Sequence, residues 1–454
     1  MKIGAIHASA GPVGLARAEG DRPLAGVGFD WAVVGCSLWF IGGLYLDGWA
    51  HLHVPQLETF FTPWHAVLYS GYFAVAALLM VTWIRHRAAG YRGSWSMPAG
   101  YELSLLGAGI FAVGGLGDMI WHTLFGIEVD IDALLSPTHL ILALGGTLIV
   151  TGPLRAAWCR REEGPQGLVS RLPMLLSLTL LLSVCTFFTQ YVHPFGATIA
   201  ATSYRPATLY RPDVRLDLRD GQLRVVAPAP GSPAARAGLR PGDRIVRIAG
   251  QSTEGLSARQ VSALIRGEHP SPVSLTMIRD SAQLMVALPR ERLVVEEIGF
   301  WRQAAGISGI LLETGLLMGI ILLVVRRWTL PLGSLTLIVG LNGLWMTLMR
   351  DSALSTGPYP LIAVAVLSGL TGDLLARRLQ PSAGRPSSLR LFAFAVPVIL
   401  YLLYFLALMV TGGGIWWSLH FWTGAVVMAG VVGWLLSYLV CPPPATPTVD
   451  LQRG

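Results

Sequence analysis

The sequence predicts an all-α polytopic membrane bundle of about ten transmembrane helices, with a small α+β domain inserted in its middle. Composition is the first reason. Hydrophobic residues make up 53% of the 454 residues, charged residues only 13%, and the mean hydropathy is +0.56, whereas soluble proteins carry about 25% charged residues. Apolar stretches of membrane-spanning length recur along the chain, and one polar segment, about 205–295, interrupts them.

The apolar stretches fall into two sets of five. Each is roughly 18 to 25 residues long, which is the length that crosses about 30 Å of hydrocarbon. Residues 1–27 contain no apolar core of a signal peptide, so we expect a cytoplasmic N-terminal segment there and a cytoplasmic tail at 442–454. The first set, within 28–200, comprises 28–49, 63–84, 102–125, 137–154 and 172–192, and the second, within 300–441, comprises 304–325, 329–349, 358–376, 389–411 and 416–440.

Arginine clusters indicate the orientation. They follow alternate spans, at 85–92, 155–161, 326–327 and 377–385. Because Arg and Lys stay on the cytoplasmic side, both termini are expected in the cytoplasm of a cell (inner) membrane protein, with the polar insert outside. Arg350 is a single charge against this pattern. The net charge of +7 therefore indicates topology and not nucleic-acid binding.

The insert has its own sequence signature. Short alternating segments at 222–226 and 272–277 predict strands, and the run GSPAARAGLRPGDRIVRIAG occupies 231–250. Gly238 and Gly242 allow tight turns, while Ile245 and Ile248 would form the buried side of a strand. This run, with SARQVSALIRG at 257–267, closely resembles the PDZ domains of bacterial Do-type and C-terminal-processing proteases.

The PDZ resemblance implies an α+β fold that adds an extended peptide or a free C-terminus to a sheet edge. Segment 210–219 contains no glycine where the family has a Gly-rich carboxylate loop, so a purely structural or partner-docking role stays open beside peptide binding. The chain contains no His-Glu-x-x-His, and no serine and lysine pair of the processing-protease type follows the insert. From these absences we expect that the chain is not a protease.

A repeated motif occurs where the first and third spans end. Each copy reads Asp-x-x-x-His, then a Glu, then Ser/Thr-Pro-x-His at the start of the next span. Residues four apart lie on one helical face, and Thr62 and Ser136 are typical N-caps, each followed by Pro. A fainter copy, with Asn342 at the Asp position, follows the seventh span and suggests an internal repeat of helix hairpins. The two full copies supply Asp47, His51, His65, Asp118, His122 and His139.

An Asp with two His is a common ligand set for zinc, copper or iron. Ionisable residues near membrane depth are costly to bury and therefore tend to be functional. The six residues are thus predicted to form a metal site on the extracytoplasmic side, either as one cluster or as one triplet orienting the other. A proton relay or polar ligand pocket is the alternative. The spacing is similar to the copper-binding pattern in the C subunit of particulate methane and ammonia monooxygenases. Additional candidate ligands are His53, Glu58, Glu128, Glu313 and His420.

The predicted function is that of an integral membrane metalloprotein with copper- or zinc-dependent oxidation or hydrolysis. Two other functions stay open: a non-enzymatic envelope scaffold or sensor whose PDZ-like domain binds a protein partner, and a transporter. The chain shows no haem Cys-x-x-Cys-His motif and no nucleotide-binding loop, and its four cysteines form no disulfide framework. The expected partners are the lipid bilayer and a protein or peptide.

Overall fold

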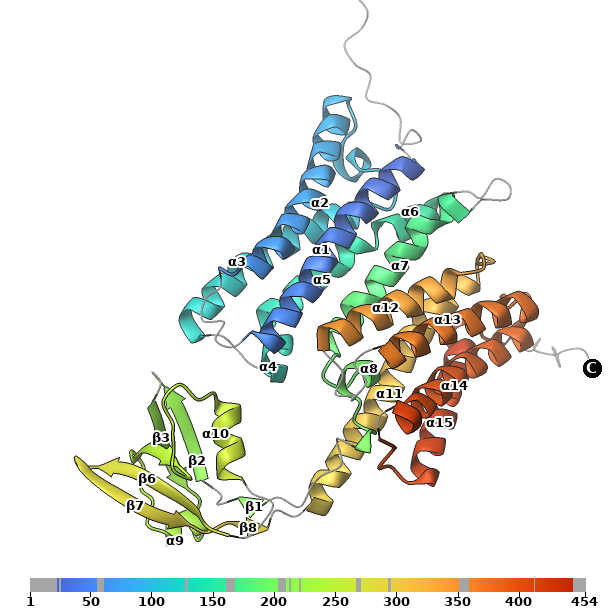
Figure 1. Ribbon diagram of the computed structural model, residues 1–454. Coiled ribbons are helices and arrows are strands. Elements are labelled where there is room, and N and C mark those ends of the chain that lie inside the picture. The colour runs from blue at the N-terminus through green and yellow to red at the C-terminus, as the bar shows by residue number, and fades with distance from the viewer. Residues whose placement is uncertain are drawn as a thin grey trace, which may run out of the picture. The chain divides into compact units, whose positions relative to one another are not determined.

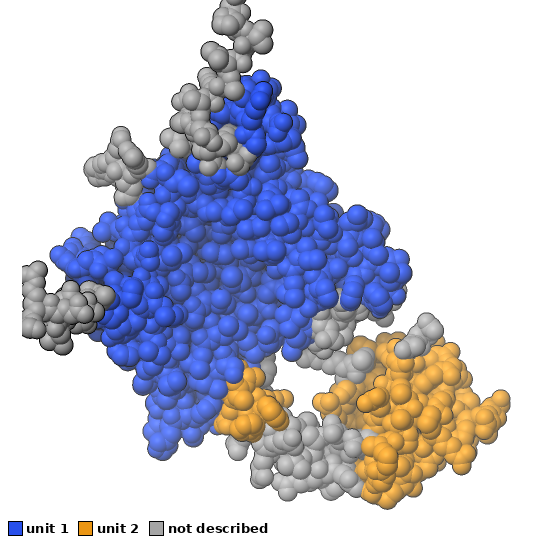
Figure 2. Space-filling model, turned by 180° about the vertical axis from the view of Figure 1, so that it is seen from behind, with its two compact units in different colours: residues 1–203, 306–454 blue, residues 204–305 orange. Residues whose placement is uncertain are grey.

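The computed structural model describes residues 23, 26–54, 61–126, 130–160, 168–202, 210–211, 214–219, 222–266, 271–292, 295–350, 359–411 and 413–443. The chain divides into two compact units (Figure 2). A helical unit comprises 1–203 and 306–454, and a smaller unit comprises 204–305.

The helical unit contains four helix hairpins and two further long helices (Figure 1). Helix α7 packs against α1, α5 and α12 and is the most buried of the candidate spans. The hairpins are α1 (Val27–His53) with α2 (Pro63–Ala88), α3 (Glu102–Phe125) with α5 (Pro137–Val150), α12 (Ser334–Arg350) with α13 (Tyr359–Leu379), and α14 (Pro386–Thr411) with α15 (Leu419–Val440). The remaining helices are η1 (Gly93–Ser96), α4 (Asp130–Leu135), α6 (Gly152–Cys159), α7 (Leu168–Phe188), α8 (Pro194–Ala197) and α11 (Val295–Val325).

Eight of the described helices are long and apolar enough to cross a membrane, and the number rises to nine if the bent pair α5 and α6 counts as one span. The sequence predicted about ten. The bend of 40° between α5 and α6 falls at Gly152-Pro153, where proline cannot donate a backbone hydrogen bond. Helix α12 is only 17 residues long, which is at the lower limit for a span.

The predicted N-caps are confirmed. The Thr62 side chain accepts a hydrogen bond from the backbone N–H of His65, and Ser136 accepts one from His139. Each cap is followed by a proline in the first turn, at 63 and 137. The caps fix where the returning helices α2 and α5 begin, and so they place both histidines in the first turn.

The smaller unit is an antiparallel sheet with two short helices. Its main strand order is β2-β3-β4-β6-β7, with β5 on β4, and β1 pairs separately with β8. Ile245 and Ile248 are buried as predicted, with 1% and 0% of their surface exposed. The strands are β1 (Tyr210–Arg211), β2 (Val214–Arg219), β3 (Gln222–Pro228), β4 (Arg244–Ile248), β5 (Gln251–Ser252), β6 (Val273–Arg279), β7 (Ala282–Leu288) and β8 (Glu291–Arg292), and the helices are α9 (Pro233–Arg236) and α10 (Ala258–Ile265).

Two turns of this unit need glycine, as predicted. Gly238 and Gly242 have φ angles of +81° and +91°, a region that side chains other than glycine's adopt only with strain. Between them the chain turns from α9 into β4. The turn brings the Asp243 side chain, which is only 2% exposed, next to Arg279 of β6.

Candidate metal centres and the PDZ domain

The first candidate metal centre lies at the end of hairpin α1–α2. Asp47 and His51 are one turn apart on α1, and His65 faces them from the first turn of α2. His65 Nδ1 lies 3.2 Å from Asp47 Oδ1, and His51 Nε2 lies 3.7 Å from Asp47 Oδ2. One ligand atom from each of the three residues lies within 4.8 Å of the others. We call this group the first triad.

The second triad has the same construction in hairpin α3–α5. Asp118 and His122 are one turn apart on α3, and His139 faces them from the start of α5. His139 Nε2 lies 3.1 Å from Asp118 Oδ1, and His122 Nε2 lies 3.5 Å from the same oxygen. These three ligand atoms also lie within 4.8 Å of one another. Both predicted triplets are therefore brought together by the fold, each within its own hairpin.

The two carboxylates have different surroundings. Asp118 Oδ1 accepts a hydrogen bond of 2.8 Å from Thr138 Oγ1. Trp64 occupies the corresponding position in the first hairpin, and Asp47 Oδ1 is buried 3.2 Å from His65 Nδ1 but without a well-aligned hydrogen bond among the described residues. A buried carboxylate oxygen without a partner is costly, and a bound cation would remove that cost.

His122 is oriented by the backbone. Its Nδ1 lies 3.2 Å from the Gly126 carbonyl oxygen, which can only accept, so Nδ1 carries the proton. In the neutral ring, Nε2 then presents a lone pair toward the Asp118 carboxylate. Two acceptors that face each other at 3.5 Å repel, and either a proton on Nε2 or a bound cation between them would remove the repulsion. A histidine whose one nitrogen donates to a carbonyl while the other faces a carboxylate is typical of metal sites.

The triads are separate groups of three, not one group of six, yet they are close enough to interact. Asp118 and His139 act electrostatically on Asp47. Tyr69 of α2 connects the two hairpins. Its ring stacks on His65 at 6.3 Å between centroids, and a Cβ on Gly115 of α3 would lie 3.0 Å from its hydroxyl oxygen. Neither Tyr69 nor Thr138 is predicted from the sequence as part of a site, although Thr138 lies inside the Ser-Pro-Thr-His motif.

The additional candidate ligands do not join the triads where the structure describes them. His53 Nδ1 bonds to the Trp49 carbonyl oxygen at 2.8 Å, and its ring stacks on Trp49. Glu313 lies at a different place in the unit, next to Thr189 and His193. His420 is exposed near the start of α15. Glu58 and Glu128 lie outside the described residues.

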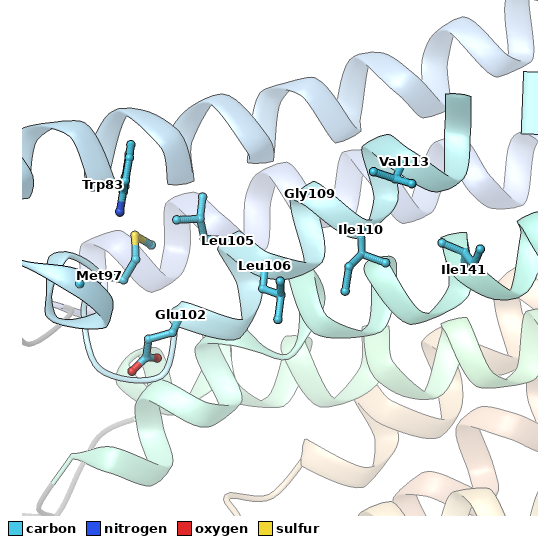
Figure 3. A pocket seen from close by; sticks show the side chains of 10 residues that line it. Trp83, Met97, Glu102, Leu105, Leu106, Gly109, Ile110, Val113 and Ile141 are labelled. Carbon is cyan, nitrogen blue, oxygen red and sulfur yellow. The ribbon is translucent and has the colours of Figure 1, made fainter. Parts of the chain in front are cut away.

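A large hollow of the helical unit lies away from the triads. It has a volume of about 770 Å³ and lies along α3 toward the helix end opposite Asp118 (Figure 3). Glu102 is the ionisable side chain in its lining, and it accepts a hydrogen bond from the Gly100 N–H at the start of α3. This hollow has an apolar lining and no cluster of ionisable or metal-ligating side chains among the described residues. Its other lining residues are Trp83, Gly93, Met97, Leu105, Leu106, Gly109, Ile110, Val113 and Ile141.

In the smaller unit, one ion pair joins the turn before β4 to β6. Arg279 donates from Nε to Asp243 Oδ1 and from Nη2 to Oδ2, each at 2.7 Å, and the Arg240 N–H donates to Oδ2 at 2.8 Å. Chiefly because of the hydrogen bonds from Arg279, the pKa of Asp243 lies below its usual value. The pair stabilises the turn and does not resemble a catalytic group.

The smaller unit contains a PDZ domain of the kind found in C-terminal processing proteases, because the family described as PDZ domain matches residues 224–279. The carboxy-terminal processing protease CtpA of Bacillus subtilis (strain 168) is 32% identical over 85 residues, 18% of this chain and 18% of that protein. A probable CtpA-like serine protease of Staphylococcus aureus (strain N315) is 35% identical over 82 residues, 18% of this chain and 16% of that protein. The chain thus spans less than a fifth of the length of these relatives.

Among solved structures, the photosystem II D1 C-terminal processing protease aligns with 42% of this chain and 44% of its own, at 20% identity and a TM-score of 0.20. That score is too low to indicate a shared overall fold.

The relatives correct two expectations from the sequence. The expectation that the chain is not a protease is wrong, because proteins that share its soluble domain are named as processing proteases. The same finding contradicts the predicted function, a metalloprotein with copper- or zinc-dependent oxidation or hydrolysis. It also contradicts the two alternatives, a scaffold or sensor and a transporter. The catalytic motifs sought in the sequence are absent outside the insert, whereas the likeness to processing proteases lies in the insert itself.

Proposed function

We propose that this chain takes part in proteolysis at a membrane and that its PDZ domain binds the polypeptide to be cleaved. The observation that supports this is the match of the PDZ domain to C-terminal processing proteases. PDZ domains bind extended peptides by adding them to a sheet edge. Within the described residues, β2 pairs only with β3, so the other edge of β2 is available for a further strand.

Apolar side chains near this edge would contact alternate residues of the peptide. Leu216 and Leu218 of β2 and Leu264 of α10 are partly buried against the same core. Main-chain hydrogen bonds along the edge would supply affinity, and these side chains would supply specificity. The absence of glycine at 210–219 favours an internal extended segment over a free C-terminus as the ligand.

Peptide binding is tested with full-length protein in detergent and a library of extended peptides, each made with a free and an amidated C-terminus. Leu218→Lys should weaken binding at least about tenfold, because a charge enters the apolar edge. The matched control is Val226→Lys, which places the same charge at a 41% exposed position on β3 and should bind like wild type. Equal affinity of all three proteins would contradict the proposal.

Proteolysis is tested on the peptides selected in that experiment, incubated with full-length protein in liposomes and followed by mass spectrometry. We expect new peptide termini with wild type and Val226→Lys, and a matching loss with Leu218→Lys. Peptides that bind but stay intact would refute the proteolytic part while leaving the binding part standing.

We further propose that each triad binds one divalent metal ion, copper or zinc. The observation in favour is that three ligand atoms of each triad lie within 4.8 Å of one another, which is close to the separation of ligand atoms around one ion with bonds of about 2.0–2.2 Å. Each triad would leave at least one coordination position open. The matching construction of the two hairpins is consistent with an internal repeat of the helix hairpin, which we propose as the origin of the two sites.

Metal binding is measured as the metal content of full-length protein purified in detergent and equilibrated with Cu²⁺ or Zn²⁺. Wild type should hold two ions per chain, His65→Ala one, and the double variant His65→Ala with His139→Ala none. His420→Ala, an exposed histidine outside the triads, is the control and should keep two. If His65→Ala removed both ions, the triads would form one shared site, and if it removed neither, the proposal would be lost.

A further inference from the structure

A second group of buried ionisable residues lies in the helical unit, separate from the triads. Glu313 of α11 and His193 before α8 are 5% and 6% exposed. They line a small hollow of about 30 Å³ together with Thr186 of α7, Asn342 of α12 and Tyr401 of α14. Asn342 is also the residue at the Asp position of the fainter third copy of the repeated motif.

The tautomer of His193 follows from the backbone. The Phe195 N–H donates to His193 Nδ1 at 3.1 Å, so Nδ1 has no proton and the neutral ring carries its proton on Nε2. A second proton would break the bond from Phe195. His193 is therefore neutral, and its Nε2–H lies on the side of Glu313, where Nε2 is 3.9 Å from Oε2.

The state of Glu313 follows from its partners. No cation pairs with it among the described residues, because His193 is neutral and Arg350 bonds instead to Gln190 Oε1 at 3.4 Å. An ionised carboxylate without a cation at this depth would cost several kcal/mol. Glu313 Oε1 lies 2.5 Å from Thr189 Oγ1, whose single hydrogen can instead bond to the Cys185 carbonyl at 3.1 Å. A proton on Glu313 satisfies all of these groups.

A water molecule fits between the two residues. The distance of 3.9 Å is too long for a direct hydrogen bond, and a hollow of about 30 Å³ exceeds the roughly 10–15 Å³ that one water needs. His193 Nε2–H can donate to it and Glu313 Oε2 can bond to it. The Asn342 side chain, whose amide nitrogen donates to Thr186 Oγ1 at 2.7 Å, provides a further polar wall.

We propose that Glu313, His193 and Asn342 form a third polar site of the helical unit, which binds one water molecule and one exchangeable proton held by neutral Glu313. The water accepts a hydrogen bond from His193 Nε2–H and bonds to Glu313, so that the carboxylic acid can exchange its proton with the water while His193 keeps its own. Arg350 of α12 acts electrostatically on His193, and Glu313 acts on Tyr45 of α1, Cys185 of α7 and Tyr401 of α14. The site is independent of the proposed peptide and metal binding.

Infrared difference spectroscopy of full-length protein in liposomes at neutral pH tests the proton. Wild type minus Glu313→Gln should show the C=O stretching band of a protonated carboxylic acid, shifted when H₂O is replaced by D₂O. Glu254→Gln, an exposed glutamate of the PDZ domain, should leave that band unchanged. A difference spectrum with only carboxylate bands would overturn the neutral Glu313, and a band insensitive to D₂O would overturn the exchange.

The bridging water is tested by His193→Phe, which keeps a ring in place but removes the donor. The Glu313 band should persist and move in frequency, because the carboxylic acid loses its water partner. An unmoved band would show that no water connects the two residues. The wild-type spectrum is also compared in H₂O and D₂O without any variant. If wild type shows no protonated carboxylic acid band that shifts in D₂O, the proposal fails even when a variant does not fold.

Discussion

At the scale of single residues, Asp118 and Asp47 differ more than their shared motif suggests. Thr138 donates to Asp118 Oδ1, whereas Asp47 Oδ1 receives no such hydrogen bond from Trp64 at the matching position. Asp118 is therefore held in one orientation by a neighbour, while Asp47 depends on its two histidines. A ligand whose position is fixed before binding loses less entropy when the metal arrives, so the second triad should bind the same ion more tightly than the first.

Asp243 provides the pH dependence that the PDZ domain should show. Its pKa is lowered in the folded protein, first of all by the hydrogen bonds from Arg279. A group with a lowered folded-state pKa contributes its full stabilisation above the unfolded-state value, about 3.9 for Asp. As the pH falls from there through the lower folded-state pKa, the domain loses that contribution.

The corresponding prediction concerns Asp243→Asn. The variant should lower the free energy of unfolding of the PDZ domain at neutral pH, because Arg279 loses the charge of its partner. It should also flatten the dependence of stability on pH below about 4. Hydrogen exchange in β3 and β6 of the full-length protein measures both effects. Glu254→Gln serves as control, and equal behaviour of the two variants would contradict the assigned role.

At the scale of elements, the hairpins that hold the triads are closed by glycines. A Cβ on Gly43 of α1 would lie 2.5 Å from the Leu68 Cα of α2, and one on Gly71 would lie 2.6 Å from the Phe40 Cα. Gly107 and Gly145 make the same kind of backbone approach between α3 and α5. Small residues that let helices approach closely are typical of membrane helix pairs, and here they set the distance from which both histidines reach their aspartates.

Gly43→Ala should therefore lower the free energy of unfolding of the detergent-solubilised protein by about 1–3 kcal/mol, because the added methyl group forces α1 and α2 apart. Thermal unfolding measures this loss. Alanine has the higher helix propensity, so any loss comes from packing. Gly35→Ala on the same helix, where a Cβ meets nothing within 4 Å, is the matched control and should be neutral or slightly stabilising. A loss of equal size in both variants would show that the contact with Leu68 does not matter.

The apolar stretches of the sequence were sufficient to predict the long helices but not the contacts between them. Caps at Thr62 and Ser136 could be predicted, because they depend on neighbours within three residues. The proximity of His193 and Glu313 could not be predicted, because the two residues are 120 positions apart in the sequence and no motif links them. Hydropathy predicts one span across Gly152-Pro153, because it does not register the loss of the backbone donor at which the helix bends.

At the scale of the whole molecule, the distribution of arginine predicts which side of the membrane each unit faces. The clusters at 85–92, 155–161, 326–327 and 377–385 should all lie in the cytoplasm by the positive-inside rule. Arg350, the charge against the pattern, bonds to Gln190, so a partner within the protein accounts for it. If α12 and the bent pair α5 and α6 also cross, the spans number ten, both termini are cytoplasmic and the PDZ domain lies outside.

Cysteine labelling in spheroplasts of an expressing bacterium tests this orientation directly. Cys159 is exposed and follows the fourth predicted span, whereas Met285 on β7 of the PDZ domain is 77% exposed. An impermeant maleimide should label Met285→Cys in intact spheroplasts but leave the wild type unlabelled, and lysis should expose Cys159, with Cys159→Ser as the control. Labelling of Met285→Cys only after lysis would place the PDZ domain in the cytoplasm. The polypeptides available for it to bind would then be cytoplasmic, and the arginine clusters would have to owe their positions to contacts within the protein.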